Sequence, residues 1–334
     1  MDFIAWNRLR RKNKGLINKE VMLNMKLIYM GTPDFAVNAL EALIDAGHEI
    51  AAVITQPDKA KGRSKALVPT PVKEKALEHG IAVYQPEKIK DAEMVEKIKK
   101  IAPDAIVVAA YGQILPESIL NIPRYGCINI HASLLPKYRG AAPIEWAIID
   151  GEDITGVTTM YMEKGLDTGD IIEKAEVKIE DTDTGVSLRD KLAKKGAELI
   201  LSTLQALEEG TAKRIKQEDE KSCYAKMLTK ELGNIDFGET AHKLERLIRG
   251  LNPWPCAYTK IDGKTVKIYG AAVRETDAHM YTPGEIIEIT KKSFTVACGR
   301  DALVIKKLQP EGKKPMDAAA YLNGNTLAIG DKLG

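Results

Sequence analysis

The chain has 334 residues, of which 44% are hydrophobic and 29% are charged. It holds no uninterrupted apolar run of the roughly 20 residues that cross a bilayer, so we expect no membrane association. Its 26 glycines and 15 prolines are near average usage, which excludes collagen-like and disordered classes. A chain of this length is typical of two domains with separate cores.

The formal net charge of +2 conceals an uneven distribution. Residues 1–24 sum to +4, residues 25–229 to −5 and residues 230–334 to +3. A polyanionic partner would therefore meet local basic surface. The four cysteines lack any C-x-x-C pairing, which indicates neither a zinc site nor a redox dithiol. We expect no metal, and we expect small buried thiols in a reducing cytoplasm.

The first 24 residues do not form a secretory signal, because four basic residues at positions 8–12 are followed by no apolar stretch. The first stretch with the pattern of a buried strand followed by a turn, MKLIYMGTPDF, begins only at Met25. We therefore interpret residues 1–24 as a non-native or disordered extension that results from a misassigned start. A basic arm that contacts nucleic acid is the alternative.

From Met25 onwards, apolar segments alternate with amphipathic ones. Buried strands are predicted at residues 26–30, 49–55, 81–84, 104–112 and 126–133, with helical stretches at 35–47 and 71–80 and a polar loop at 56–67. This alternation implies crossover connections and a mostly parallel sheet covered on both faces. A more exposed pair of strands at 155–163 and 171–179 and a helix at 186–207 complete a first domain of residues 25–210.

The pattern changes in the last third of the chain. Residues 211–229 are polar and charged with little periodicity, which predicts a linker. A helical stretch at 241–249 follows, and then short alternating segments separated by turns such as Asp262-Gly263. Residues 230–334 are thus predicted to form a small β-barrel of the OB type.

The turn after the first predicted strand argues against a dinucleotide. It reads Gly31-Thr32-Pro33-Asp34-Phe35, without the second and third glycines that let a pyrophosphate approach, and no P-loop pattern is present. Nicotinamide binding is therefore not expected. The ligand is predicted to lie at the carboxyl ends of the parallel strands.

Two polar residues mark one of those strand ends. Asn129 and His131 alternate along a predicted strand, so their side chains lie on one face, next to a loop with Pro136 and Gly140. A single histidine of this kind is more often structural than catalytic. The carboxylates of the turn-forming loop at 165–170 would ordinarily be solvated. These residues by themselves leave catalysis open.

Several longer motifs together resemble the methionyl-tRNA formyltransferase family, over essentially the whole chain from Met25. The motifs are GTPDF at 31–35, TQPD at 55–58, VVAAYGQILP at 107–116, INIHASLLPKYRGAAPIEWAI at 128–148, GLDTGD at 165–170 and LNPWP at 251–255. The Asn-x-His-x-Ser-Leu-Leu-Pro element is shared by the wider group of 10-formyltetrahydrofolate-dependent formyltransferases and hydrolases. The basic loop after TQPD and the C-terminal β-domain with LNPWP distinguish the methionyl-tRNA formyltransferase family from the rest of that group.

The resemblance implies a Rossmann-like catalytic domain with an OB-like C-terminal domain, and a catalytic trio of Asn129, His131 and Asp167. An amine that attacks a formyl carbon creates an oxyanion, to which Asn129 and His131 would donate; each such donor is worth about 3–4 kcal/mol. Asp167 would hold the imidazole and help to remove the proton of the incoming ammonium. Direct transfer, without a formyl-enzyme, is expected.

The resemblance also implies the position of the formyl donor, 10-formyltetrahydrofolate. The pterin is expected in a pocket near Gln113, Ile114 and Leu115 and near the loop at 166–170. The donor is expected to lie along the residues that follow His131, which are Ser133, Leu134, Leu135 and Pro136. An apolar strand exit without a ligand is the alternative for the second group.

The acceptor implied by the resemblance is methionyl initiator tRNA. In the family, the insertion at 58–65 contacts the acceptor stem, which here would involve Lys59, Lys61, Arg63 and Lys65. Lysine and arginine clusters bind phosphate with a strong salt dependence, although a charge run by itself is more often a solvated loop. The family loop usually reads G-R-G-K-K, whereas this one reads GRSKA at 62–66, with one basic residue fewer.

Other functions remain open at this stage. The enzyme alternative is transfer to another amine, such as an amino-sugar nucleotide, which the basic loop disfavours. A folate- or RNA-binding protein without turnover and a formylfolate hydrolase are further alternatives. We expect a monomer, because the tRNA must reach both domains.

Overall fold

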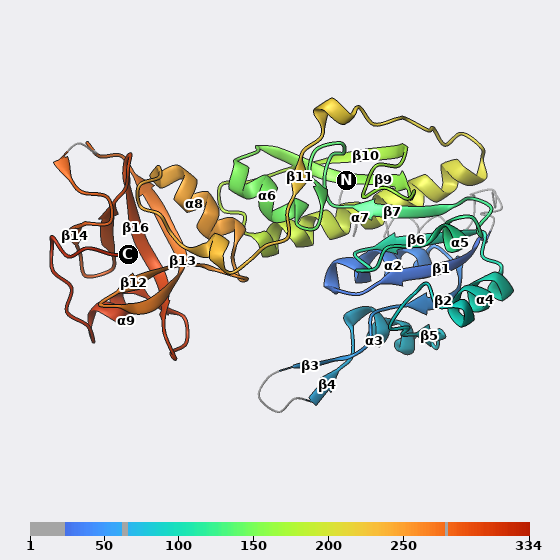
Figure 1. The fold of residues 1–334 in the computed structure, drawn as a ribbon, viewed down its shortest axis with the longest axis horizontal. Coiled ribbons are helices and arrows are strands. Elements are labelled where there is room, and N and C mark those ends of the chain that lie inside the picture. The colour runs from blue at the N-terminus through green and yellow to red at the C-terminus, as the bar shows by residue number, and fades with distance from the viewer. Residues whose placement is uncertain (1–23, 62–65, 278–279) are drawn as a thin grey trace, which may run out of the picture.

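A computed structural model describes residues 24–61, 66–277 and 280–334. The predicted extension at 1–24 therefore lies outside the described residues except for Asn24. The catalytic part and the C-terminal β-rich part lie next to each other, with α6 (Pro143–Asp150) and α8 (Ala241–Gly250) between them (Figure 1).

A seven-stranded sheet forms the centre of the first part. Its order is β10-β9-β7-β6-β1-β2-β5, and the five strands from β7 to β5 pair in parallel whereas β9 and β10 are antiparallel. The strands are β1 (Lys26–Gly31), β2 (Glu49–Ile54), β5 (Val83–Tyr84), β6 (Ala105–Ala109), β7 (Cys127–His131), β9 (Ile154–Tyr161) and β10 (Ile171–Lys178). The predicted Rossmann-like, mostly parallel sheet is confirmed.

Helices cover both faces of this sheet. They are η1 (Asp34–Ala36), α2 (Val37–Asp45), α3 (Pro71–Glu78), α4 (Ala92–Ile101), α5 (Glu117–Leu120), α6 and α7 (Gly185–Glu208). Leu27 and Tyr29 of β1 pack towards α2 and α7, whereas Ile28 and Met30 pack towards α4. All four side chains are fully buried, which explains why β1 reads as a continuous apolar run.

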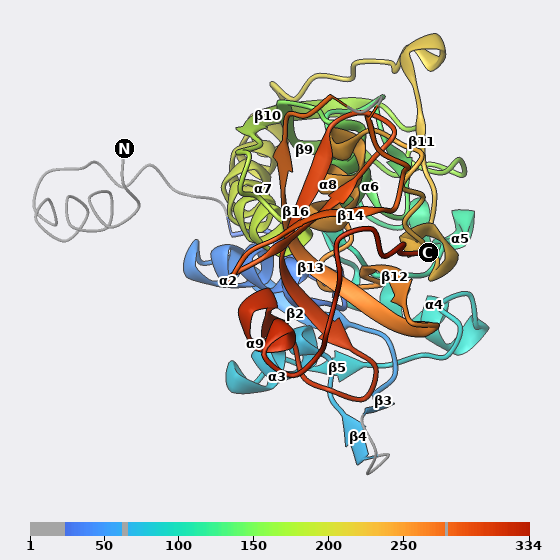
Figure 2. The ribbon, with the colours of Figure 1, turned by 90° about the vertical axis from the view of Figure 1, so that its left-hand side faces the viewer.

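The polar loop expected at 56–67 contains a short hairpin. β3 (Lys59–Lys61) and β4 (Ala66–Val68) pair antiparallel, and the hairpin projects from the body of the catalytic domain (Figure 2). Residues 62–65 at its tip lie outside the described residues. The exposed Leu67 and Val68 of β4 show that the hairpin packs little against the domain.

The C-terminal part is an antiparallel sheet with its own core. Its strands are β12 (Ala257–Ile261), β13 (Lys264–Arg274), β14 (Ile286–Ile289), β15 (Phe294–Ala297), β16 (Ala302–Pro310) and β17 (Met316–Asp317). α8 and α9 (Ala318–Leu322) pack on it through Leu244, Ile248 and Tyr321. The predicted small β-domain of antiparallel strands is confirmed.

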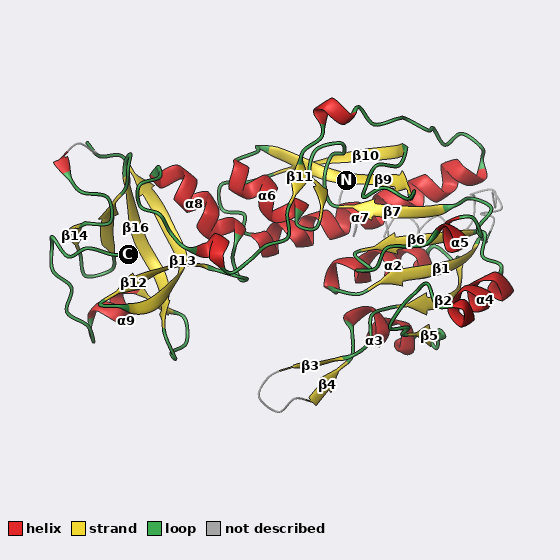
Figure 3. Ribbon diagram, in the orientation of Figure 1, coloured by secondary structure: helices red, strands yellow, loops and turns green. Residues whose placement is uncertain are grey.

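The segment at 211–229 runs along the catalytic part before it reaches α8 (Figure 3). Ile215 bridges to Ile171, η2 (Asp219–Lys221) follows, and β11 (Tyr224–Ala225) pairs with β8 (Arg139–Gly140). The short η3 (Glu231–Gly233) precedes α8. An apolar cluster then joins the two parts. It contains Ala142 at the start of α6, Ile149 on α6, Leu228 and, at the end of α8, Leu251.

Candidate active site

A pocket of about 710 Å³ lies at the carboxyl ends of β1, β6 and β7. These strands are adjacent and parallel, so their ends meet at one edge of the sheet, where ligands of such folds bind. The loops after β1 and β6 contribute Phe35 and Tyr111, and β7 contributes Asn129 and His131. The predicted location of the ligand thus coincides with a pocket of the size that small molecules occupy.

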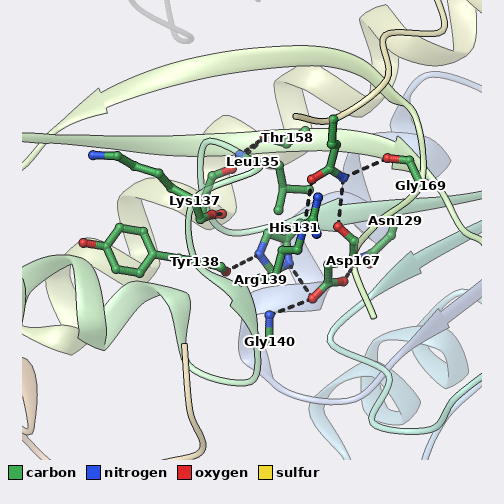
Figure 4. Close-up of polar contacts among 12 residues, drawn as sticks. Asn129, His131, Leu135, Lys137, Tyr138, Arg139, Gly140, Thr158, Asp167 and Gly169 are labelled. Atoms are coloured by element: carbon green, nitrogen blue, oxygen red, sulfur yellow. Dashed lines mark hydrogen bonds and ion pairs between the residues drawn. The ribbon is translucent and has the colours of Figure 1, made fainter. Parts of the chain in front are cut away.

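His131 is 5% exposed, at the end of β7. Its Nε2 lies 2.9 Å from the carbonyl oxygen of Tyr138. Because a carbonyl only accepts, Nε2 carries a proton and donates it there. Nδ1 lies 3.7 Å from Oδ2 of Asp167, so it is the ring nitrogen that faces the carboxylate (Figure 4).

Asp167 sits in the loop that follows β9, with a φ of +52°. Its Oδ2 accepts a hydrogen bond of 2.9 Å from the backbone N of Gly140, and its Oδ1 accepts from Nδ2 of Asn129 at 3.5 Å. The structure therefore brings Asn129, His131 and Asp167 together around one wall of the pocket, although they are up to 38 residues apart. Figure 4 shows the three side chains facing one another.

The residues expected near the pterin line the same pocket. Gln113, Ile114 and Leu115 all belong to its wall, and Ile114 is 79% exposed at the mouth. The side chain of Gln113 supports the neighbouring loop, since its Oε1 accepts from the backbone N of Ile89 at 2.8 Å. Tyr111 also lines the pocket, but its side chain packs into the core beside Leu115, and this burial raises the pKa of its hydroxyl to about 12.

The residues at 133–136 do not line the pocket. Ser133 and Leu135 are fully buried, and Oγ1 of Thr158 donates to the carbonyl of Ser133 at 2.6 Å and accepts from the backbone N of Leu135 at 3.1 Å. Oγ of Ser133 donates to the carbonyl of Lys137 at 2.6 Å. Leu134 and Pro136 are half-buried in the same turn. This turn anchors the exit of β7 against β9.

The basic residues expected to contact tRNA map to the β3–β4 hairpin. Lys59 is exposed on β3 and Lys61 lies at the end of the same strand. Arg63 and Lys65 lie outside the described residues. The structure therefore places the described part of this basic group on a projecting hairpin that does not line the pocket.

Sequence reasoning missed two features of the pocket. Glu145 of α6 is 8% exposed and pairs with Arg189 of α7, with 2.5 Å between Oε1 and Nη2, and both residues line the pocket. Gln217 and Tyr224 come from the segment predicted as a linker: Gln217 bonds the loop of Asp167, and Tyr224 lines the pocket. Glu145 lies within the motif at 128–148, but its ion pair with Arg189 cannot be read from the sequence, and Arg189, Gln217 and Tyr224 lie outside the quoted motifs.

The described residues form neither a metal site nor a membrane-spanning helix. Within residues 24–61, 66–277 and 280–334, no three His, Cys, Asp or Glu side chains are grouped so that they could hold a metal ion. None of the helices among these described residues is both long and apolar enough to cross a bilayer.

The parallel sheet with a pocket at the carboxyl ends of its strands is that of a formyl transferase, as two family profiles show. The formyl transferase profile matches residues 24–204, and the profile of the formyl transferase C-terminal domain matches residues 227–326. The methionyl-tRNA formyltransferase of Lachnospira eligens is 54% identical over 314 residues, which cover 93% of this chain and all of that one. The chain belongs to the methionyl-tRNA formyltransferase family, and the resemblance seen in its motifs is confirmed.

Further relatives agree with this assignment. The methionyl-tRNA formyltransferase of Agathobacter rectalis is 53% identical over 300 residues, covering 90% of this chain and 96% of the relative. Among solved structures, HypX from Aquifex aeolicus in complex with tetrahydrofolic acid has a TM-score of 0.61 at 18% identity, over 90% of this chain and 47% of its own. An N-formyltransferase from Helicobacter canadensis, solved with folinic acid and dTDP-3-aminofucose, has a TM-score of 0.63 at 20% identity, over 86% and 99%. These two likenesses establish the fold.

Proposed function

We propose that this protein transfers the formyl group of 10-formyltetrahydrofolate to the α-amino group of methionyl initiator tRNA, for translation initiation. The observation that supports it most is the Asn129-His131-Asp167 grouping in the pocket of a chain about half identical to methionyl-tRNA formyltransferases. The enzyme class follows from the family, and the residue roles below are part of the proposal.

The donor fits the walls of the pocket. 10-Formyltetrahydrofolate supplies the formyl group, and a flat heterocycle needs apolar walls with a few polar groups at its edges. Ile114, Leu115, Met160 and Leu166 line the pocket beside the trio. We assign Gln113, Ile114 and Leu115 to the pterin wall, with Ser133, Leu134, Leu135 and Pro136 as the turn that fixes the exit of β7, the strand that carries Asn129 and His131.

Asn129 and His131 stabilise negative charge on the formyl oxygen. Asn129 has amide N–H donors next to the carboxylate of Asp167. In His131, the donor is Nδ1, because Nε2 is held by the carbonyl of Tyr138. Nδ1 carries a proton when the imidazole is charged, so the charged form supplies the donor. Donors fixed in advance stabilise the developing charge without reorganisation.

Asp167 moves the proton that the amine loses. Its carboxylate faces Nδ1 of His131 and is itself held by the backbone N of Gly140. It accepts a proton from the incoming ammonium, directly or through water, and holds the imidazole in place. No nucleophilic side chain takes part, so transfer is direct: the amine nitrogen forms the new bond to the formyl carbon, the bond from that carbon to N10 of the donor breaks, and the proton lost by the amine is returned to N10.

The tRNA contacts two surfaces in this proposal. The basic hairpin with Lys59, Lys61, Arg63 and Lys65 contacts the acceptor stem, and the C-terminal domain follows the backbone with its lysines. Both contacts are with phosphates, so the affinity should fall steeply as salt rises. The domains we assign are residues 25–210 for catalysis, 211–229 as the connection and 230–334 for tRNA binding. We further propose a cytoplasmic monomer, which sedimentation at low micromolar concentration tests.

The decisive experiment is single-turnover transfer of labelled formyl to methionyl initiator tRNA. We expect rapid transfer to the charged tRNA, none to free methionine, and a loss of about 100- to 10,000-fold in His131→Ala. The matched control is His79→Ala, since His79 is exposed at the end of α3. Free formate without labelled tRNA, or labelling of an amino-sugar nucleotide instead, would contradict the proposal.

A further inference from the structure

The side-chain amide of Gln217 uses both its donor and its acceptor at the loop that carries Asp167. Its Nε2 donates to the carbonyl oxygens of Asp167 and Gly169, each at 2.8 Å. Its Oε1 accepts from Nε of Arg139 at 3.0 Å. An amide has two N–H groups and one oxygen, so this side chain matches its surroundings in every hydrogen-bonding group.

The loop held by Gln217 has an unusual backbone. Asp167 has a φ of +52°, a left-handed backbone conformation that residues other than glycine rarely adopt. Such a conformation persists only where surrounding contacts determine it. The carbonyl of Asp167 itself is one of the two that Gln217 binds, so the bond acts directly on the strained residue.

The other end of the amide reaches the chain segment next to His131. Arg139 follows Tyr138, whose carbonyl oxygen accepts the hydrogen bond from Nε2 of His131. Gln217 therefore connects the segment that orients the imidazole with the loop that carries the carboxylate. The distance of 3.7 Å between Nδ1 of His131 and Oδ2 of Asp167 depends on how these two segments are held.

Gln217 lies on an anchored segment. The backbone of Ile215 bonds to Ile171 in both directions, at 2.8 and 3.0 Å. Further along, the carbonyl of Cys223 accepts from the backbone N of Arg139 at 2.9 Å. Arg139 also donates from Nη2 to Asp219 at 2.8 Å, beyond Gln217 on the same segment. The amide is thus presented to the site from a fixed backbone.

We propose that Gln217 is a positioning residue for formyl transfer, which sets the place of the Asp167 carboxylate relative to His131. The inference rests on the proposed function for its reaction. It assigns a catalytic contribution to the segment between the two domains, beyond that of a connection.

Two variants separate the functions of the amide. Gln217→Met removes all three hydrogen bonds and keeps a side chain of similar size. Gln217→Glu keeps the oxygen that accepts from Arg139 but replaces the amide nitrogen by an oxygen, which would face the two carbonyl oxygens. We expect kcat to fall about 10- to 100-fold in both, because misplacing a catalytic group by about 1 Å costs up to that much. KM for methionyl-tRNA should stay within about twofold, since neither substrate loses a contact.

The pH–rate profile distinguishes positioning from a general loss of structure. Because Asp167 and His131 act together in the proposed proton transfer, a displaced Asp167 should change the pH dependence of kcat, whereas a general loss of structure should lower kcat by the same factor at every pH. The matched control is Gln205→Met on α7, whose Nε2 bonds to Glu209 at 2.8 Å on the exposed face of the helix. It should leave kcat and the profile unchanged.

A second measurement does not depend on the reaction. Backbone hydrogen exchange at residues 165–170 should be faster in Gln217→Met than in the unchanged protein, with the core strands β1 and β6 unaffected. Exchange and kcat that both stay within twofold would overturn the proposal. Absence of transfer by the unchanged protein would instead contradict the proposed function, and the exchange result would then decide the positioning contact by itself.

Discussion

Nζ of Lys73 lies 2.6 Å from Oδ2 of Asp58, at the base of the β3–β4 hairpin. The same Nζ donates to Oε1 of Gln85 at 2.7 Å, and Nε2 of Gln85 donates back to Oδ1 of Asp58 at 2.7 Å. Hydrogen bonds from Lys73 and Gln85 hold the pKa of Asp58 below its usual range. Because Asp58 directly precedes β3, this closed network ties the basic hairpin to α3.

Lys73→Met should therefore weaken tRNA binding without slowing the chemical step. Loss of the cation releases the base of the hairpin, and we expect KM for methionyl-tRNA to rise on the order of tenfold while kcat at saturation is kept. Steady-state kinetics at fixed salt measures both constants. Lys75→Met is the control, since Lys75 lies on the same helix but pairs with Glu41 and Glu78. An equal rise in KM in both variants would contradict the role of the network.

Cys223 should be the thiol that reacts first in the folded protein. It is exposed, whereas Cys127, Cys256 and Cys298 are buried. Burial also raises the pKa of the Cys127 and Cys298 thiols to about 12, which keeps them protonated and unreactive. A disulfide-exchange reagent at pH 8 should label one thiol per chain rapidly. Rapid labelling of two or more thiols would be inconsistent with the structure.

Labelling of Cys223 should also slow formyl transfer. Its Sγ accepts from the backbone N of Tyr138 at 3.1 Å, and the carbonyl of Tyr138 holds His131. A bulky adduct on the sulfur displaces that N–H, so we expect transfer to slow about tenfold or more. Cys223→Ser keeps an acceptor at this place and should resist the reagent with its activity retained. Full activity of the labelled protein would show that Tyr138 is held by its other contacts.

Asp183 gives the protein a stability that depends on pH. Burial opposes its ionisation, but hydrogen bonds from Lys191, from the backbone N of Glu180 and from Ser187 outweigh burial and hold the pKa of this carboxyl below its usual range. A carboxyl whose pKa is lower in the folded than in the unfolded chain stabilises the fold at neutral pH. That contribution is lost as the pH falls below about 4.

Asp183→Asn should consequently lower the free energy of unfolding by about 1–3 kcal/mol at pH 7. The difference from the unchanged protein should shrink as the pH is lowered towards 3, because the aspartate of the unfolded chain then takes up a proton that the folded chain still resists. Urea unfolding at a series of pH values measures it. Asp190→Asn, at an exposed position of α7, is the control and should change little at any pH. A difference that is constant with pH would exclude the carboxylate as its source.

The sequence predicted the scaffold of the site better than the contacts that complete it. Continuous apolar runs marked β1, β6 and β7, and alternation placed Asn129 and His131 on one face of β7, because these patterns follow directly from burial. The motif GLDTGD at 165–170 also indicated Asp167, in a loop of turn-forming residues. The contact of Gln217 with that loop left no pattern, since it joins a side chain to backbone carbonyls 50 residues earlier in the chain. Because every residue has a backbone carbonyl, a contact with a carbonyl leaves no signal in the sequence.

The turn at 133–136 shows the limit of motif reading in another way. Ser133 and Leu135 are part of a strongly patterned motif, yet their contacts are internal, with Thr158 and Lys137. A motif marks residues that a family shares, and residues can be shared because they pack in the fold as well as because they bind a ligand. The motif therefore did not reveal which of the two applies to this turn. The basic hairpin was readable from its charge, whereas the network of Asp58, Lys73 and Gln85 at its base required the three-dimensional structure.

The contact between the two domains depends on Gly250 at the end of α8. A Cβ there would lie 2.7 Å from Cγ1 of Ile149 and 3.1 Å from the carbonyl oxygen of Glu145, both on α6. Gly250→Ala should therefore force α6 and α8 apart, and overpacking of this kind costs about 1–3 kcal/mol. We expect a lower melting temperature and a higher KM for methionyl-tRNA, since the proposed tRNA surfaces lie on both domains. Gly324→Ala is the matched control, because nothing lies within 4 Å of a Cβ at that position. Melting curves that coincide for the two variants would show that the domains accommodate the methyl group without separating.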